Sequence, residues 1–358
     1  MAKSKLTLIV DGNWLLMSRL AVLNNRFDTP QELMQNVKKL LIRSISVALR
    51  TFPMIDNIIF VSDGGSWRTD IAIPENLSKK QDIGEIQSAS YKGTREKSDD
   101  IDWDTIFAGF EDFTNTLNTN GISAFREKGV EGDDWAFFWS TYLNSQGTNC
   151  IIWTADKDLT QLVKTDKNSC FTVWWNAKSG IICEDKDDND MDFFFNNQYN
   201  VNQNVFNDVV NKVNDIKKIN PSDVVIEKIL KGDASDNIQP IMVRRSKNVT
   251  SQKKFKISSK DIDYNLNYNN DNDVLNYISE VYNSKSYQGR VEDSIDEVFE
   301  HFKYNRKLVE LSKTELPIEI YNKMASHINE LKYSADISKA ESVIMAQTNE
   351  IANIAEMI

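Results

Sequence analysis

Histidine and cysteine are scarce in this chain of 358 residues, and their scarcity excludes several kinds of chemistry. Only His301 and His327 occur, both late in the chain, so a Ser-His-Asp triad or a histidine-rich metal site would have to draw on these two. The three cysteines are an odd number without a C-x-x-C motif, which indicates neither a disulfide framework nor a zinc ribbon. Any catalysis is therefore expected to use carboxylates and hard metal ions, in a reducing cytoplasm.

Long hydrophobic runs are also missing. The longest apolar stretches, such as Leu6–Val10, are far shorter than a membrane span, and no signal-peptide core follows the N-terminal lysines. With 41% hydrophobic and 27% charged residues, the composition is typical of a soluble globular protein with one large or two smaller domains. We therefore expect a cytoplasmic protein without a membrane partner.

Apolar runs that end in aspartate recur along the first half of the chain. KLTLIVD ends at Asp11, NIIFVSD at Asp63 and NCIIWTAD at Asp156. Helix-like stretches separate these runs, and strands that alternate with helices indicate an α/β fold with a largely parallel sheet. Ligand sites in such sheets lie beyond the carboxyl ends of the strands, so the three aspartates are expected at one edge. The helices expected in this half span 30–49, 103–118, 132–144 and 159–163.

The remaining segments suggest a division of the chain. Residues 64–102 are polar, with little apolar period and several lysines and arginines, so a long loop or arch over the sheet end is expected. The C-terminal part is helix-patterned, and its last segment carries an apolar stripe for packing or for a partner. The predicted domains are an α/β domain over 1–185, a mostly helical domain over 186–335 and a helical tail over 336–358.

Nine carboxylates fall into five short acidic elements. Each element alone has a structural explanation, as a helix cap, a favourable charge at a helix start or a turn. Together these explanations weaken, because like charges gathered at one sheet edge repel unless a cation neutralises them. Mg²⁺ and Mn²⁺ prefer such oxygen ligands, and a pair of divalent ions is a standard device for phosphodiester cleavage. The nine residues are Asp11, Asp63, Glu131, Asp133, Asp134, Asp156, Asp158, Asp233 and Asp236.

Positive side chains supply candidate phosphate ligands despite the net charge of -11. In YKGTR, Lys92 and Arg95 can hold a phosphate and Tyr91 offers a face for base stacking, and Arg68 in SWRTD is a further candidate. Each of these alone could equally be an ordinary solvated loop residue. The stretch 242–260 contains no acid, and its candidate DNA contacts are Arg244, Arg245, Lys247, Lys253, Lys254 and Lys256.

Six motifs occur in the order DGNWLL, SDGGSWR, YKGTR, EGDD, TADKDLTQL and ILKGDASDNI. With this set in this order, the sequence resembles the flap endonuclease / 5′-3′ exonuclease family, and within it looks most like the ribonucleases H of T4-type bacteriophages. The similarity runs from about residue 6 to 238 and more weakly to about 330. It implies a PIN-like nuclease domain with a mainly parallel central sheet and a helical arch over about 64–102, followed by a mostly helical C-terminal domain.

The resemblance also implies an activity, which is metal-dependent removal of RNA primers and 5′ flaps during DNA replication. It implies two Mg²⁺ ions as cofactors, with Mn²⁺ as a substitute. Carried over by motif, the first metal site takes Asp11, Asp63, Glu131, Asp133 and Asp134. The other carried-over residues are Asp156 and Asp158 between the sites, Asp233 and Asp236 at the second site, and Lys92 and Arg95 on the phosphate.

The implied partners are nucleic acids: DNA with a 5′ flap or nick, and RNA–DNA hybrids. A single-strand-binding protein and a sliding clamp follow from the resemblance alone, and a monomer in the host cytoplasm is expected if the chain is phage-encoded. One departure concerns duplex binding. After GDASDN the chain continues QPIMVRRSKNV, without the glycine-rich helix-hairpin-helix of most cellular relatives, so the basic run 242–260 is expected to take over that role.

Two other functions remain open from the residues alone. A PIN-like endoribonuclease uses a similar sheet and acidic cluster, and cleavage of a DNA flap without RNA would separate the two nucleases. A non-catalytic protein that binds DNA junctions is the second alternative. Every acidic position of the pattern is filled in this sequence, which favours the enzyme over the binding protein.

Overall fold

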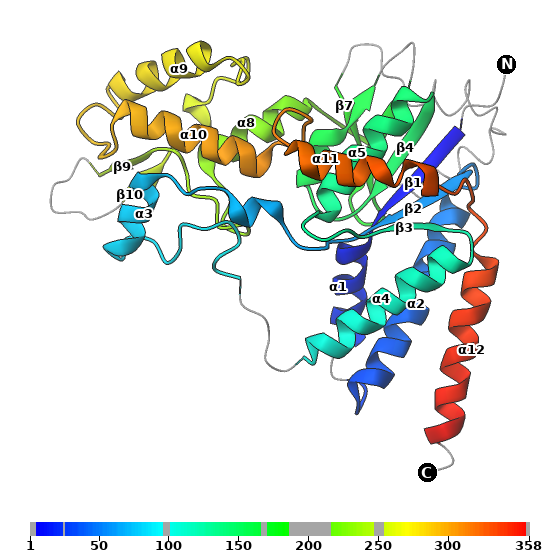
Figure 1. Ribbon diagram of the computed structural model, residues 1–358. Coiled ribbons are helices and arrows are strands. Elements are labelled where there is room, and N and C mark those ends of the chain that lie inside the picture. The colour runs from blue at the N-terminus through cyan, green and yellow to red at the C-terminus, as the bar shows by residue number, and fades with distance from the viewer. Residues whose placement is uncertain are drawn as a thin grey trace. The chain divides into compact units, whose positions relative to one another are not determined.

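The computed structural model describes residues 5–23, 26–95, 101–165, 170–185, 216–246 and 254–355 (Figure 1). The chain forms two compact units. The first unit contains Met1–Ser66, Ser98–Ile219 and Ile318–Ile358, and the second contains Trp67–Lys97 and Asn220–Pro317. Across the described ranges, no helix combines the length and the apolar character needed to cross a membrane.

An eight-stranded sheet forms the centre of the first unit, in the order β3-β2-β1-β4-β6-β7-β8 with β5 paired to β6. Strands β3, β2, β1, β4 and β6 run parallel to their neighbours, whereas β7 and β5 pair antiparallel with β6. The predicted α/β fold with a largely parallel sheet is confirmed. The strands are β1 Lys5–Asp11, β2 Asn57–Val61, β3 Ser123–Phe125, β4 Thr148–Trp153, β5 Lys164–Thr165, β6 Phe171–Asn176, β7 Gly180–Glu184 and β8 Ile216–Ile219.

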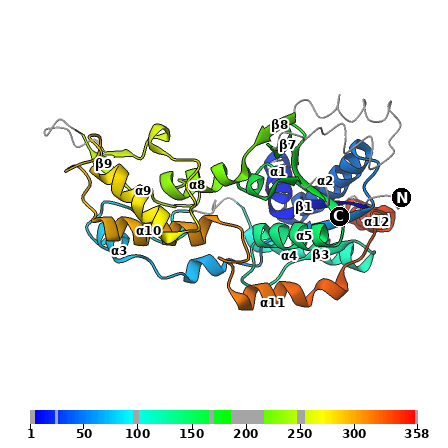
Figure 2. The same cartoon turned by 90° about the horizontal axis from the view of Figure 1, so that it is seen from above.

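Helices cover both faces of this sheet, as Figure 2 shows. Helix α2 packs against α1, α4 and α12, and this group shares one hydrophobic core with Leu6, Leu8 and Val10 of β1. Helix α5 contacts β1, β2, β4 and β6. A sheet buried on both faces requires strands that are apolar throughout, which explains the continuous apolar runs in the sequence. The helices are α1 Gly12–Leu23, α2 Pro30–Thr51, α4 Trp103–Thr119, α5 Gly132–Ser145, α11 Ile318–Ser326 and α12 Ser338–Ala355, with 3-10 helices η2 Asp158–Leu162 and η5 Ile328–Glu330.

The second unit is mostly helical, as predicted, and has a hydrophobic core of its own. Residues such as Ile229, Ile278 and Phe302 are fully buried in it. A two-stranded antiparallel hairpin of β9 and β10 completes the unit. Its elements are η1 Trp67–Asp70, α3 Glu75–Asp82, α8 Pro221–Lys231, β9 Val243–Arg245, β10 Lys254–Lys256, η4 Ser259–Asp261, α9 Asp271–Asn283 and α10 Ile295–Val309.

The segment 64–102 differs from its expected loop structure. It contains η1 and α3, and it buries Leu77, Ala89 and Tyr91 in the core of the second unit. The Tyr304 hydroxyl also donates a hydrogen bond to the Ala89 carbonyl at 3.3 Å. The apolar side chains are few and irregularly spaced, and they are buried by residues more than 100 positions later, so local periodicity does not reveal them.

Candidate metal centre

The sheet of the first unit brings three aspartates to one edge. Asp11 is the last residue of β1, and Asp63 and Asp156 follow the ends of β2 and β4. Because β1 lies between β2 and β4 and all three run parallel, their carboxyl ends meet at the same edge. The N-terminus of α5, which carries the EGDD motif, lies at this edge too, since the Gly132 N–H donates to the Asp63 carboxylate at 2.6 Å.

Each carboxylate oxygen of Asp11 accepts one hydrogen bond. Its Oδ1 accepts from the Trp14 N–H at 3.0 Å, so Asp11 does cap helix α1. Its Oδ2 accepts from the Thr154 hydroxyl at 2.7 Å, and the same hydroxyl oxygen accepts from the Asp156 N–H at 2.9 Å. Thr154 therefore links the ends of β1 and β4. Thr154 was not predicted from the sequence, although it stands two positions before Asp156 in the TADKD motif.

Two neighbours, Asn13 and Gly132, position Asp63. Its N–H donates to the Asn13 Oδ1 at 3.0 Å, which ties the DGNW motif to the end of β2. A Cβ atom at Gly132 would lie 3.1 Å from the Asp63 Oδ1, so glycine allows the close approach of the α5 backbone to this carboxylate. Asn13 is a second positioning residue that the sequence analysis missed, and the DGN tripeptide was its only signal.

The EGDD motif starts helix α5. The Asp134 Oδ2 accepts a hydrogen bond from the Glu131 N–H at 3.2 Å, and both side chains are buried. Acidic side chains at this end are favoured by the helix dipole, so the local structural explanation of the motif is also correct. Asp133 is half-buried on the first turn of the same helix.

Electrostatic repulsion connects five of these carboxylates. Burial raises the pKa of Asp11 to about 6; hydrogen bonds from Thr154 and Trp14 oppose this shift, and repulsion from Asp63 and Asp156 adds to it. Burial also raises the pKa of Asp133 well above its usual value, and repulsion from other carboxylates raises it further. Every charged group among these causes is acidic. We call Asp11, Asp63, Glu131, Asp133 and Asp156 the acidic cluster.

Asp158, also predicted as a metal ligand, is tied to Asp156. Its N–H donates to the Asp156 Oδ1 at 2.8 Å, and the Trp174 indole N–H donates to the Asp156 carbonyl at 2.8 Å. Asp158 begins the 3-10 helix η2, where the sequence predicted a helix over 159–163. These bonds fix the DKD turn and orient the Asp156 carboxylate, because one of its oxygens is engaged by its own turn.

The acidic residues of the second unit have cationic partners. The Lys228 Nζ lies 2.7 Å from the Asp233 Oδ2 and 3.8 Å from the Asp236 Oδ2. Burial alone would raise the pKa of Asp233, but hydrogen bonds from Lys228 and Ser235 outweigh it and lower this pKa to about 2. Asp233 is thus held as a carboxylate. Lys228 was not recognised in the sequence, because it lies in helix α8 before the GDASDN motif.

The YKGTR motif packs against GDASDN in the second unit, more than 130 residues later in the chain. The Lys92 N–H donates to the Asp236 carbonyl at 2.8 Å, and the Arg95 guanidinium forms an ion pair with the Asp236 carboxylate. Lys92 has a φ of 54°, in the left-handed region that is strained for a side chain other than glycine. Its ammonium lies 4.8 Å from the centre of the Tyr91 ring.

Two residues predicted to contact nucleic acid, Arg68 and Tyr91, are buried. Arg68 is only 3% exposed, its Nε donates to the Leu308 carbonyl at 3.1 Å, and its guanidinium lies 4.6 Å from the Trp67 ring centre. It therefore anchors the second unit internally instead of offering a phosphate clamp. Tyr91 is 6% exposed and belongs to the hydrophobic core of that unit, so its ring is not a face on which a base can stack.

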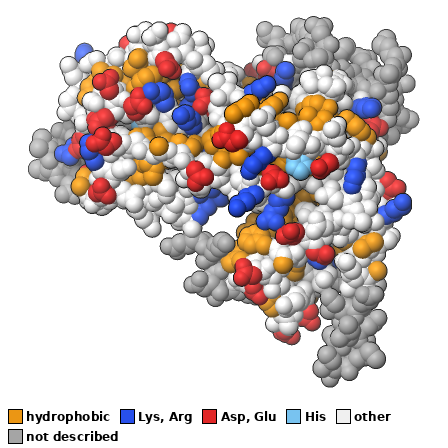
Figure 3. Space-filling model, viewed as in Figure 1, with side chains coloured by type: hydrophobic (Ala, Val, Ile, Leu, Met, Phe, Trp, Pro, Cys, Tyr) orange, Lys and Arg blue, Asp and Glu red, His pale blue; other side chains and the backbone are white. Residues whose placement is uncertain are grey.

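The basic run forms the β9–β10 hairpin, and its cations differ in their environments. Arg244 is turned toward the unit, with its guanidinium 5.5 Å from the Phe255 ring centre and 5.2 Å from that of Tyr287. Arg245, Lys254 and Lys256 are all exposed, and the first two form ion pairs with glutamates. On the face in Figure 3, acidic and basic side chains are intermixed over α9 and α10. Lys247 and Lys253 lie outside the described residues.

Comparisons with known proteins agree with this architecture. The fold is similar to a crystal structure of the D15 protein of bacteriophage T5 co-crystallised with metal ions, with 16% identity, a TM-score of 0.52, and coverage of 91% of this chain and 99% of that chain. It is also similar to the T5 5′-exonuclease with bound zinc, with 16% identity, a TM-score of 0.50, and coverage of 91% of this chain and 99% of that chain. At this identity the likeness shows the fold alone.

Family membership follows from the sequence. No curated relative matches the chain. Residues 6–191, more than half of the chain, match the family of 5′-3′ exonuclease N-terminal, resolvase-like domains. This range includes every member of the acidic cluster. The chain therefore belongs to the 5′-3′ exonuclease family and is a nuclease.

Proposed function

We propose that this nuclease is a structure-specific, divalent-metal-dependent 5′-3′ exonuclease and flap endonuclease that removes RNA primers and 5′ flaps in phage DNA replication. The observation that carries the proposal is the acidic cluster. Burial at the edge of a parallel sheet raises the pKa of Asp11 and Asp133, and the neighbouring charges that raise these two pKa values further are all carboxylates. Such an arrangement is costly by itself and becomes favourable when a divalent cation occupies it.

The donor set fits Mg²⁺ or Mn²⁺. The cluster offers only carboxylate oxygens, which are the ligands that these hard cations prefer, and no imidazole or thiolate belongs to it. We assign the first cation to the acidic cluster, with Asp134 placing Glu131 through its hydrogen bond. We assign a second cation to Asp233 and Asp236 of the second unit. The metal ions and zinc in the T5 relatives are consistent with a divalent cofactor.

A bound divalent cation lowers the pKa of water toward neutrality and stabilises the charge that develops on the leaving oxygen. The protein's part is to fix the carboxylates beforehand. Thr154 holds Asp11 and the Asp156 backbone, and Asn13 holds the Asp63 backbone, so little reorganisation is needed during the reaction. No histidine is required as a base, which agrees with the two histidines being outside the cluster.

Lys92 and Arg95 are assigned to the phosphate of the substrate. A lysine supplies a point charge and an arginine a two-pronged donor, and both suit a phosphate oxygen. The ion pair of Arg95 with Asp236 leaves the arginine half-exposed, so part of its guanidinium can reach another acceptor. The substrates that we propose are DNA with a 5′ flap or nick and RNA–DNA hybrids, bound by the protein as a monomer.

Cleavage of three labelled substrates tests the proposal. A 5′ flap, a nicked duplex and an RNA–DNA hybrid are each incubated with Mg²⁺ or with EDTA, using the wild-type protein, Asp156→Asn and the control Asp104→Asn, which changes an exposed residue of α4. We expect Mg²⁺-dependent products that are lost only in Asp156→Asn. Cleavage of RNA alone would favour the endoribonuclease, and binding without cleavage would favour the junction-binding protein.

A further inference from the structure

The β9–β10 hairpin carries its charges on one face. Arg245 pairs with Lys254 and Val243 with Lys256 across the two strands, while Arg244 pairs with Phe255. Side chains alternate between the faces of a hairpin, so Arg245, Lys254 and Lys256 share one face and Arg244 lies on the other. Like charges that face each other across strands are unfavourable without compensation.

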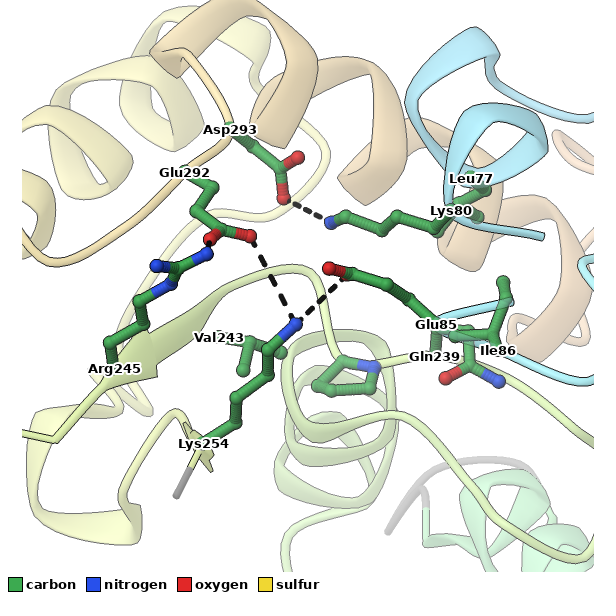
Figure 4. Close-up of a pocket in the computed structure, with 11 residues that line it drawn as sticks. Leu77, Lys80, Glu85, Ile86, Gln239, Val243, Arg245, Lys254, Glu292 and Asp293 are labelled. Atoms are coloured by element: carbon green, nitrogen blue, oxygen red, sulfur yellow. Dashed lines mark hydrogen bonds and ion pairs between the residues drawn. The ribbon is translucent and has the colours of Figure 1, made fainter. Parts of the chain in front are cut away.

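Two carboxylates provide this compensation. Glu292 forms an ion pair with Arg245 and lies 4.0 Å from the Lys254 Nζ, and Glu85 lies 2.9 Å from the same Nζ. Figure 4 shows these four side chains converging around a pocket of about 200 Å³. The hydrogen bond from Lys254 lowers the pKa of Glu85, which keeps this group ionised at neutral pH. We call Glu85 and Glu292 the carboxylate clasp.

The clasp is not what holds the hairpin to the second unit. The Arg245 N–H donates to the Arg290 carbonyl at 2.9 Å, and the Arg290 Nε donates back to the Arg245 carbonyl at 2.8 Å. A β-bridge joins Arg244 to Val291 beside them. These contacts, and the stacking of Arg244 on the aromatic rings, do not involve the clasp carboxylates and should remain when those carboxylates are neutralised.

The ion pairs of the carboxylate clasp are exposed enough for another anion to replace the glutamates. Their side chains are 29–63% exposed, and ion pairs of this kind contribute only about 0–1 kcal/mol. The neighbouring pair of Lys80 with Asp293 is different, because these side chains are 19% and 10% exposed and their atoms are 2.5 Å apart. We expect the buried pair to persist and the exposed pairs to open when a stronger anion approaches.

We propose that the carboxylate clasp restrains DNA binding by the hairpin, because Glu85 and Glu292 occupy two cations that DNA phosphates would otherwise contact. In the clasped state, only Lys256 on this face lacks an ion pair among the described residues. A phosphate must displace a carboxylate to reach Arg245 or Lys254. The clasp therefore weakens the binding of duplex DNA in general. It favours substrates that other contacts of the protein already hold in place. The proposal rests on the proposed function, since it takes DNA as the ligand.

The test is the salt dependence of DNA binding. Affinity for a nicked duplex is measured in EDTA, to prevent cleavage, over a range of NaCl concentrations. The proteins are the wild type, the double variant Glu85→Gln/Glu292→Gln, and the control Glu280→Gln, which neutralises an exposed glutamate of α9. We expect the double variant to bind more tightly at low salt. Its plot of log affinity against log salt should be steeper by about 1.8, because each newly freed cation that contacts a phosphate adds about 0.9.

A third substitution identifies the cations responsible. Adding Arg245→Gln to the double variant should remove about half of the gain in slope, since one of the two freed cations is then absent. A slope in the double variant equal to that of Glu280→Gln, or shallower than the wild type, would overturn the proposal. Flap cleavage in Mg²⁺ by the same preparations separates the two failures, because loss of the clasp effect in an active nuclease leaves the proposed function intact.

Discussion

The two units use acidic residues in opposite ways. In the first unit, burial raises the pKa values of Asp11 and Asp133, and repulsion from other carboxylates of the acidic cluster raises them further. In the second unit, Asp233 and Asp236 are met by Lys228 and Arg95, and the pKa of Asp233 falls to about 2. An acidic motif thus says little about its role until its neighbours are known, because the same side chain can be stabilised by the protein itself or depend on a metal.

This contrast has a functional meaning under the proposed mechanism. A bound divalent cation would compensate the charge of the acidic cluster, so metal binding and stability are coupled there. The acids of the second unit are already compensated by cations of the protein. We therefore expect neutralisation of one carboxylate to have opposite effects on the stability of the metal-free protein in the two units.

The largest expected effect is that of Asp133→Asn on activity. Removing a ligand of the first cation should slow flap cleavage in Mg²⁺ by about a thousandfold, which corresponds to about 4 kcal/mol of lost transition-state stabilisation. In EDTA, the variant should be more stable than the wild type by about 1–2 kcal/mol, because one repelling charge is gone. Single-turnover kinetics and urea unfolding measure the two quantities. Full activity, or a less stable metal-free protein, would contradict the role of the acidic cluster.

The next effect is a dependence of metal-free stability on pH. The pKa of Asp11 is raised to about 6 in the folded protein, so folding binds a proton and the resulting stability is lost as the pH rises through this value. The full difference between the folded and unfolded pKa is on the order of 3 kcal/mol, of which about 1–2 kcal/mol should appear between pH 7 and pH 5.

Urea unfolding in EDTA at several pH values measures this contribution. The free energy of unfolding should rise as the pH falls from about 7 to 5, and Asp11→Asn should flatten the curve over this interval. Saturating Mg²⁺ should also stabilise the wild type at pH 7, by about 2.7 kcal/mol at a hundred times its dissociation constant. Identical pH curves for the variant and the wild type would show that Asp11 does not titrate in this range.

A smaller effect is expected for Asp233→Asn in the second unit. Lys228 would lose the carboxylate that lies 2.7 Å from its Nζ, whereas the Asp236 carboxylate lies 3.8 Å away, so the protein should be less stable by about 1–2 kcal/mol at neutral pH. Urea unfolding beside the control Glu280→Gln measures the change. Unchanged or greater stability would mean that the two units do not differ as described.

The smallest effect concerns Lys256, the cation on the charged face of the hairpin that has no ion pair among the described residues. Lys256→Gln should lower the slope of log DNA affinity against log salt by about 0.9, because one phosphate contact is lost. Lys339→Gln, at an exposed position of α12, provides a matched change of charge. Equal slopes in the two variants would place the DNA on another surface.

Much of the first unit could be predicted from local sequence patterns. Helix α2 was predicted over 30–49, and the structure shows local reasons for it: Thr29 caps the helix, Pro30 begins it and its buried apolar side chains repeat with the helical period. Helix α1 was missed, since its leucines follow the DGN motif closely and its apolar residues are spread around the helix. The region 159–163 forms a 3-10 helix, because the DKD turn fixes the backbone that precedes it.

The candidate site was predictable in its carboxylates and not in the residues that position them. Strand ends marked Asp11, Asp63 and Asp156 because an apolar run that stops at a charge is visible in the sequence. Thr154 and Asn13 carry no such mark, since a threonine or asparagine near a strand end has many ordinary uses. Arg68 was misplaced for a related reason, because an arginine looks the same in sequence whether it is buried or exposed.

The sequence by itself determined the parallel sheet and the edge at which its aspartates gather, since these depend on strand patterns and on a topology that follows general rules. Tertiary structure alone decided which charges are compensated. Asp233 forms an ion pair with Lys228, and the carboxylate clasp forms ion pairs with Arg245 and Lys254. In the acidic cluster, the charges that shift the pKa of Asp133 are all carboxylates. Electrostatic interactions depend on distance in space and on burial, and neither quantity can be read from separation along the chain.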